Sequence, residues 1–119
     1  NTNSVGGDTC VSITAPGGVV FTGNIYGGSY ATGNSTSSAK VTGNSSLTLN
    51  GGAYSGALYA GSGGEYGSTA GAASMIVKGN VAFKSGSSLN AGNAAGDTSL
   101  SLGSDGGTIV FDATDSRAK

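Results

Sequence analysis

Short runs of apolar residues recur in a fixed order along this chain of 119 residues, and glycine-rich turns separate them. A recurring unit strongly constrains the fold, because repeated units stack on one another and bury one continuous core. Each set contains a first run, a turn and a second run, and the first three sets continue into a third run, at residues 24–29, 57–62 and 88–93. The second runs cover residues 19–22, 46–50, 81–84 and 108–112.

Large apolar side chains occupy corresponding places in successive sets. One series, with spacings of 28, 34 and 28 residues, comprises Phe21, Leu49, Phe83 and Phe111. A second series, with spacings of 33 and 31 residues, comprises Ile25, Leu58 and Leu89. Because the order is constant while the spacing varies, we expect residues 30–38 and 63–73 to be insertions that loop out at one corner.

These patterns predict an all-β fold, a parallel β-solenoid of about four coils with glycine-rich corners. Alternate side chains of a strand point to opposite sides. Those expected to face the interior are Val19, Phe21, Leu47, Leu49, Val81, Phe83, Ile109 and Phe111. Those expected to face outward are Val20, Thr48, Ala82 and Val110. Corners require positive φ, which glycine adopts readily, and the chain contains 24 Gly.

The solenoid is expected to cover residues 11–112, between an N-terminal extension at 1–10 and a C-terminal tail at 113–119. An antiparallel sandwich is the alternative fold, in which the Gly-Asn and Asp-Gly-Gly segments form hairpin turns. A sandwich does not require the same triplet of runs to recur. It also tends to use aromatic anchors such as Trp, which the chain lacks.

Residues 40–52 (KVTGNSSLTLNGG) and 24–29 (NIYGGS) resemble repeats in the passenger regions of bacterial autotransporters and related adhesin-like surface proteins. Such repeats place apolar residues around Gly-Asn, followed by an apolar strand, Gly-Gly and an apolar-Tyr-Gly-Gly corner. The resemblance extends loosely over residues 11–112. It implies a right-handed parallel β-helix displayed outside the cell.

Residue types that catalysis or metal binding requires are scarce. The chain has no His, which excludes Ser–His and Cys–His pairs. The single Cys10 excludes a cysteine-cluster zinc site and an intrachain disulfide, and is either a buried thiol or half of a bridge to another segment. Three acidic residues near the C-terminus, Asp105, Asp112 and Asp115, are interpreted as a turn former and two solvated residues rather than a Ca²⁺ site. We therefore expect no enzyme, no cofactor and no metal.

Tyr26 and Tyr59 are the candidate ligand or partner surface. They hold equivalent places beside Ile25 and Leu58, so we expect both rings to point outward and to stack. An exposed aromatic ladder binds sugars or a partner protein in some proteins. In others it only stabilises neighbouring strands. The sequence leaves both interpretations open.

The sequence favours a structural or adhesive segment of a bacterial surface or secreted protein. The alternative is a β-helical protein that binds or degrades polysaccharide. An ice-binding solenoid is disfavoured because the threonines do not recur at one position. The 5 Lys and Arg form no face for nucleic acid, and no apolar run is long enough to cross a membrane.

The expected partners are other copies of the chain, the rest of a longer passenger, or host and matrix glycans. Neither terminal segment has the amphipathic pattern of a solenoid cap. A net charge of -1 gives little repulsion between copies. We therefore expect the open ends to be covered either by the rest of a longer passenger or by a neighbouring copy, and end-to-end stacking of copies would form fibres.

Overall fold

The computed structural model describes residues 3–15, 19–32, 39–103 and 106–111 of the chain. These residues form strands and turns and contain no helix, which confirms the all-β prediction. The strands belong to three sheets, and every pairing between strands is parallel. The parallel pairing makes the antiparallel sandwich wrong.

Each sheet combines strands that lie far apart in the sequence. The first sheet contains β1 (Asn3–Val5), β5 (Ala39–Val41) and β8 (Gly67–Thr69), in that order. The central sheet contains β2 (Thr9–Thr14), β6 (Ser45–Tyr54), β9 (Ala73–Phe83) and β11 (Thr98–Leu102), with β3 (Val20–Phe21) also paired to β6 and β12 (Ile109–Phe111) to β9. The third sheet contains β4 (Ile25–Tyr26), β7 (Ala57–Tyr59) and β10 (Ser88–Asn90).

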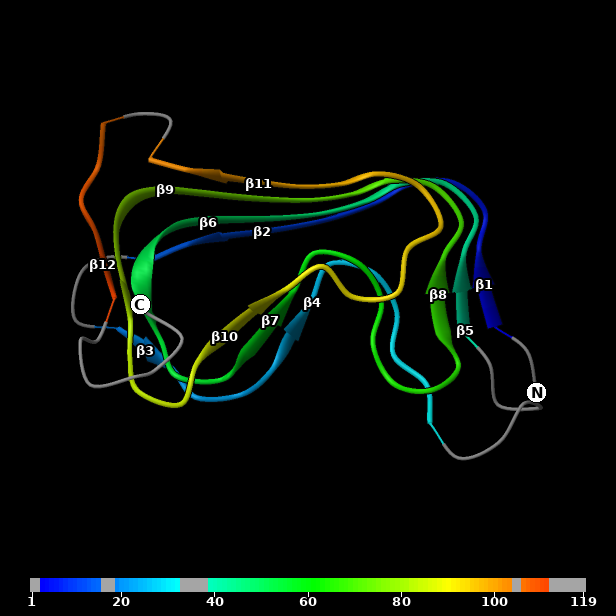
Figure 1. Cartoon of the computed structure of the whole chain (residues 1–119), viewed down its shortest axis with the longest axis horizontal. Coiled ribbons are helices and arrows are strands. Elements are labelled where there is room, and N and C mark those ends of the chain that lie inside the picture. The colour runs from blue at the N-terminus through cyan, green and yellow to red at the C-terminus, as the bar shows by residue number, and fades with distance from the viewer. Residues whose placement is uncertain (1–2, 16–18, 33–38, 104–105, 112–119) are drawn as a thin grey trace.

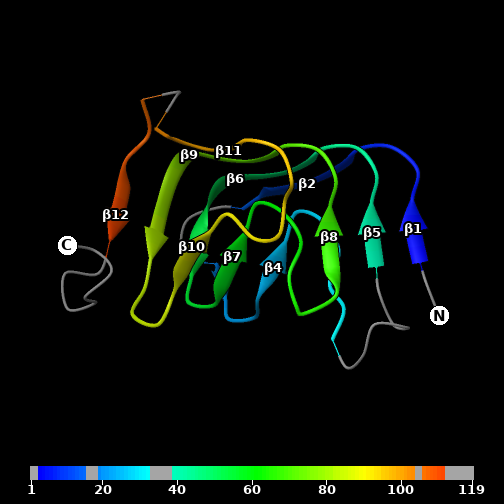
Figure 2. The same ribbon diagram turned by 45° about the vertical axis from the view of Figure 1, so that its right-hand side comes forward.

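The chain passes through the first, central and third sheets in the same order each time. We call one passage a circuit: β1–β4, β5–β7 and β8–β10 form three circuits, and β11 with β12 belongs to a fourth. Figure 1 shows the central strands β2, β6, β9 and β11 layered beside one another, and Figure 2 shows β1, β5 and β8 side by side at one end. Parallel strand pairing includes Asn3 and Thr9. Both residues precede residue 11, where the solenoid was expected to begin.

The register of the central sheet corrects one of the two predicted series. Phe21 and Phe83 pair with Tyr54 rather than with Leu49, and Phe111 pairs with Phe83. Leu49 instead pairs with Ile13 and Val77. The prediction failed because β6 runs on past Gly51 and Gly52, so the residue that pairs with Phe21 lies beyond these glycines in the sequence. The second series is confirmed, since Ile25 and Leu89 both pair with Leu58.

The predicted insertion at residues 63–73 is wrong, because it contains β8 and its last residue begins β9. The strand β8 consists of polar and small residues. It forms because its backbone pairs with that of β5, and this pairing requires no large side chain. Of the other predicted insertion, residues 30–32 are described, Tyr30 bridges to Gly63, and residues 33–38 lie outside the described part.

Alternation along the strands builds the core. The largest fully buried side chains include Tyr54, Leu47, Leu49, Leu58, Val77 and Val81. The Tyr54 hydroxyl donates a hydrogen bond to the Gly51 carbonyl oxygen at 2.7 Å, and burial raises the pKa of this phenol, which keeps it protonated. Of the residues expected to face inward, Val19 and Phe111 are 39% and 38% exposed, because among the described residues no further strand pairs beyond them.

The column of outward-facing residues on β3, β6, β9 and β12 is also apolar. Val20, Ala53, Ala82 and Val110 pair in succession across the circuits. Ala53 therefore takes the place that the sequence assigned to Thr48. Val20 and Val110 are 51% and 52% exposed, as expected for outward residues. This column lines a shallow groove of about 580 Å³.

Candidate functional site

Tyr26 and Tyr59 stack as the sequence predicted. They are paired residues of β4 and β7, their ring centroids lie 4.6 Å apart, and their planes differ by 17°. Both side chains are partly exposed. The column ends after two rings, because Asn90 is the residue that pairs with Tyr59 in β10.

A third ring, which the sequence analysis did not single out, extends this surface. Tyr30 lies 4.8 Å from Tyr26 at 43° and is 53% exposed. Gly63 leaves room for the Tyr26 ring, since a Cβ at that position would overlap it. We call Tyr26, Tyr30 and Tyr59 the tyrosine cluster.

The edge of the sheets at β10, β11 and β12, here called the C-terminal edge, exposes side chains that the alternation directs inward. Leu100 and Leu102 pair with the buried Met75 and Val77, yet they are 49% and 44% exposed. Phe111 packs on Phe83 with a centroid distance of 5.1 Å and is also exposed. These residues have apolar neighbours on one side only.

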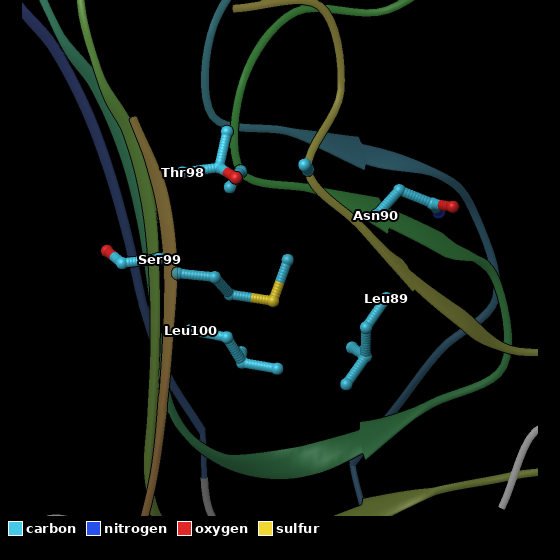
Figure 3. A pocket seen from close by; sticks show the side chains of 8 residues that line it. Leu89, Asn90, Thr98, Ser99 and Leu100 are labelled. Carbon is cyan, nitrogen blue, oxygen red and sulfur yellow. The ribbon is translucent and has the colours of Figure 1, made fainter. Parts of the chain in front are cut away.

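A pocket of about 190 Å³ opens at this edge between β10 and β11. Figure 3 shows Leu89 and Leu100 projecting into it, whereas Ser99 points away on the other side of β11. The polar residues in its lining are Asn90, Thr98 and Ser99. Asn90 donates from Nδ2 to the Leu58 carbonyl oxygen at 3.2 Å, so its amide is engaged within the fold. The pocket is an uncovered end of the apolar core.

The opposite edge, at β1 to β4 and here called the N-terminal edge, carries members of the same columns. Val11 and Ile13 pair with Leu47 and Leu49, and both are partly buried. Phe21 stacks on Tyr54 at 5.1 Å and 11°, and Ile25 pairs with Leu58. Both edges therefore end in apolar residues of the core.

Side-chain oxygens at the corners connect one circuit to the next. The Asp8 carboxylate accepts the Asn44 backbone N–H at 2.8 Å, and the Asn44 side-chain oxygen accepts the Ala72 N–H at 2.8 Å. Asn24 and Asn80 accept N–H groups of Ala57 and Thr108 in the same manner. Each acceptor belongs to the circuit that precedes the circuit of its donor in the sequence. These hydrogen bonds therefore all run in the same direction along the stack.

A buried group of hydroxyls lies where the three sheets meet, and the sequence analysis missed it. Thr69 Oγ1 lies 2.8 Å from Ser62 Oγ and donates to Ser45 Oγ at 3.3 Å. Ser29 Oγ is 3.0 Å from Ser62 Oγ. Within the described residues no buried side-chain nitrogen or oxygen lacks a partner. These hydroxyls bind one another and the backbone, which makes the group structural.

The residue types that usually hold a metal ion do not gather in the described part of the chain. No three His, Cys, Asp or Glu residues lie close enough there to hold a metal ion. Asp105, Asp112 and Asp115 lie outside the described residues. Cys10 is a free, exposed thiol on β2, so the buried-thiol interpretation is wrong. No helix among the described residues has the length and apolar character of a membrane span.

Comparisons of the chain with protein-family models, curated proteins and solved structures find no match.

Proposed function

We propose that the chain is a right-handed parallel β-helix segment with a structural or adhesive, non-enzymatic role on the surface of a bacterium or in its secreted material. The repeated order of sheets supports the β-helix, since each of the first three circuits adds one layer to the same three sheets. The parallel pairing supports the hand, because parallel crossover connections are right-handed in nearly all proteins. The corner side chains that hold adjacent circuits together agree with this interpretation.

Composition and sequence resemblance support the extracellular location. Only 11 side chains are charged, while Gly, Ser, Thr and Asn dominate the chain. The segments KVTGNSSLTLNGG and NIYGGS resemble repeats of autotransporter passengers and adhesin-like proteins. A fold whose strands pair only with the preceding and following circuits suits an elongated stalk or filament.

The exposed apolar C-terminal edge is the observation that carries the structural role. Leu100, Leu102 and Phe111 occupy interior columns, and no further strand of the described residues pairs beyond β11 and β12. A protein that works alone at high dilution normally covers such an end with a polar cap. We therefore expect this end to be covered by a further β-layer in the working assembly.

Light scattering of purified residues 1–119 tests this role. We expect the mean particle mass to grow with protein concentration, and electron microscopy to show unbranched particles of constant width. Apolar contact drives the growth, and the net charge of -1 opposes it weakly. A folded chain that stays monomeric at millimolar concentration contradicts the proposed self-assembling role.

Binding of a glycan or protein at the tyrosine cluster is a second candidate function. The partly exposed rings of Tyr26 and Tyr59 with the exposed ring of Tyr30 form an apolar surface with hydroxyl groups, which suits a sugar face. The stack alone also stabilises β4 against β7. Variants of the exposed ring separate the two roles.

Replacing Tyr30 with Ser is expected to abolish retention on a glycan array while lowering the unfolding free energy by less than about 1 kcal/mol, since the ring is half exposed. Tyr66→Ser is the matched control, because Tyr66 lies outside the cluster and should leave retention unchanged. If no glycan is retained by the unmodified chain, or both variants bind equally, the cluster is a purely stabilising stack.

A further inference from the structure

We infer that the C-terminal edge binds the N-terminal edge of a second copy of this chain, with β2 of that copy paired in parallel to β11. This inference rests on the proposed structural role and names its partner and register. Three features of the two edges carry it: matching apolar columns, an unused corner acceptor, and strands without charge.

The interior side chains of the two edges belong to the same columns. The column that begins with Val11 continues through Leu47 and Met75 to Leu100. The column that begins with Ile13 continues through Leu49 and Val77 to Leu102. A second copy in this register brings its Val11 against Leu100 and its Ile13 against Leu102. Both exposed leucines then become buried, as Met75 and Val77 already are.

The aromatic column at the corner continues in the same manner. Phe21, Tyr54, Phe83 and Phe111 are successive paired positions, with ring centroids 5.1, 6.1 and 5.1 Å apart. The exposed Phe111 of one copy faces the partly buried Phe21 of the next in the inferred register. An added aromatic pair of this kind stabilises the contact beyond the area it buries.

Asp97 supplies a hydrogen-bond acceptor for the incoming copy. Asp8 and Asn44 immediately precede β2 and β6, and each accepts the N–H of the residue at the corresponding place in the next circuit. Asp97 immediately precedes β11 and is exposed. In the inferred register the Asp8 N–H of the second copy reaches the Asp97 carboxylate.

Neither edge strand carries the residues that normally block pairing. Natural edge strands are protected by Lys, Pro or bulges. The sequences of β2 and β11 are TCVSIT and TSLSL, without charge or proline. Their exposed outward residues are small, and Cys10 belongs to the column that continues through Ser46 and Ser74 to Ser99. Head-to-tail contact therefore places Cys10 of one copy beside Ser99 of another.

Disulfide trapping between two chains tests the partner and the register. One chain is the unmodified protein, whose only cysteine is Cys10. The other carries Cys10→Ser with Ser99→Cys and an affinity tag. Paired residues of neighbouring strands lie about 4.8 Å apart, within the range of disulfide Cα distances. We expect oxidation of the mixture to give a heterodimer that reducing agent separates, several-fold more abundant than either homodimer.

The matched control moves the introduced thiol along the same strand. Ser101→Cys with Cys10→Ser places the thiol opposite Ser12, roughly 6.6 Å along the strand from Cys10, which is too far for the bond. It should give several-fold less heterodimer with the unmodified chain. Pairing it instead with Ser12→Cys, Cys10→Ser should restore the crosslink.

Equal crosslinking by the Ser99 and Ser101 variants overturns the inferred register, and a predominance of Cys10 homodimers overturns the head-to-tail contact. In either case the proposed structural role stands if particle mass still grows with concentration. Absence of both growth and crosslinking overturns the role and the inference together. The Asp97 acceptor is tested separately. Asp97→Asn keeps a side-chain oxygen, so this variant should assemble at a several-fold lower protein concentration than Asp97→Ala. Equal assembly concentrations for the two variants overturn the assignment of Asp97.

Discussion

Replacing Phe83 with alanine is expected to lower the free energy of unfolding by about 3–5 kcal/mol, the range for truncating a buried aromatic residue. The Phe83 side chain is 3% exposed and packs between Tyr54 and Phe111. Alanine leaves a cavity that the neighbouring circuits cannot close, because backbone pairing fixes their spacing. Urea denaturation followed by circular dichroism measures the loss, at a concentration where particle mass does not change.

Val20→Thr is the matched control for this substitution. Val20 belongs to the outward column of the same corner and is 51% exposed, so its isosteric replacement should cost less than half as much. Both substitutions leave the glycine corner unchanged. Equal losses for Phe83→Ala and Val20→Thr contradict the assignment of inward and outward faces.

Local patterns in the sequence were sufficient to predict that the strands pair in parallel and which apolar residues pair in the third sheet. Ile25, Leu58 and Leu89 each precede a small or polar stretch with glycine, and this local context fixed their equivalence correctly. The stacking of Tyr26 on Tyr59 follows from the same equivalence. Turn chemistry and side-chain alternation are properties of a few neighbouring residues, which explains why they are visible without the fold.

The register of β6 was not predictable by the same means. Leu49 and Tyr54 lie on either side of Gly51-Gly52, and each fits the spacing to Phe21 and Phe83 once insertions are allowed. The decision between them depends on backbone pairing with β2 and β9, which are about 30 residues away in sequence. Tyr54 was assigned no inward position from the sequence, yet the structure buries it with its hydroxyl bonded to the Gly51 carbonyl oxygen.

The candidate surfaces were likewise predictable only in part. Tyr26 and Tyr59 were predicted, but Tyr30 joins them through a ring contact with Tyr26 that the strand pattern does not reveal. Asp97 was not singled out in the sequence analysis. Its relation to Asp8 and Asn44 becomes visible only when the strands are aligned.

Replacing Gly51 with alanine is expected to lower the free energy of unfolding by at least about 2 kcal/mol, since a non-glycine residue in the left-handed region costs about 1–2 kcal/mol before any contact is counted. Gly51 has a φ of 86°. A Cβ at this position would also overlap the Ala15 carbonyl oxygen of the preceding circuit. Denaturant unfolding at low protein concentration measures the effect.

Gly86→Ala separates the two contributions. Gly86 has a φ of 92°, but its nearest potential contact, the Ser55 carbonyl oxygen, would lie at an ordinary 3.5 Å from the added Cβ. It therefore reports the backbone cost alone, and the excess for Gly51→Ala reports the close approach of two circuits. The Ala15 N–H donates to the Asn50 carbonyl oxygen at 3.0 Å, so the circuits cannot separate at this corner without breaking that bond. Equal losses for the two substitutions would mean that the corner is loosely packed, and would leave the positive φ as the only reason that Gly51 must be glycine.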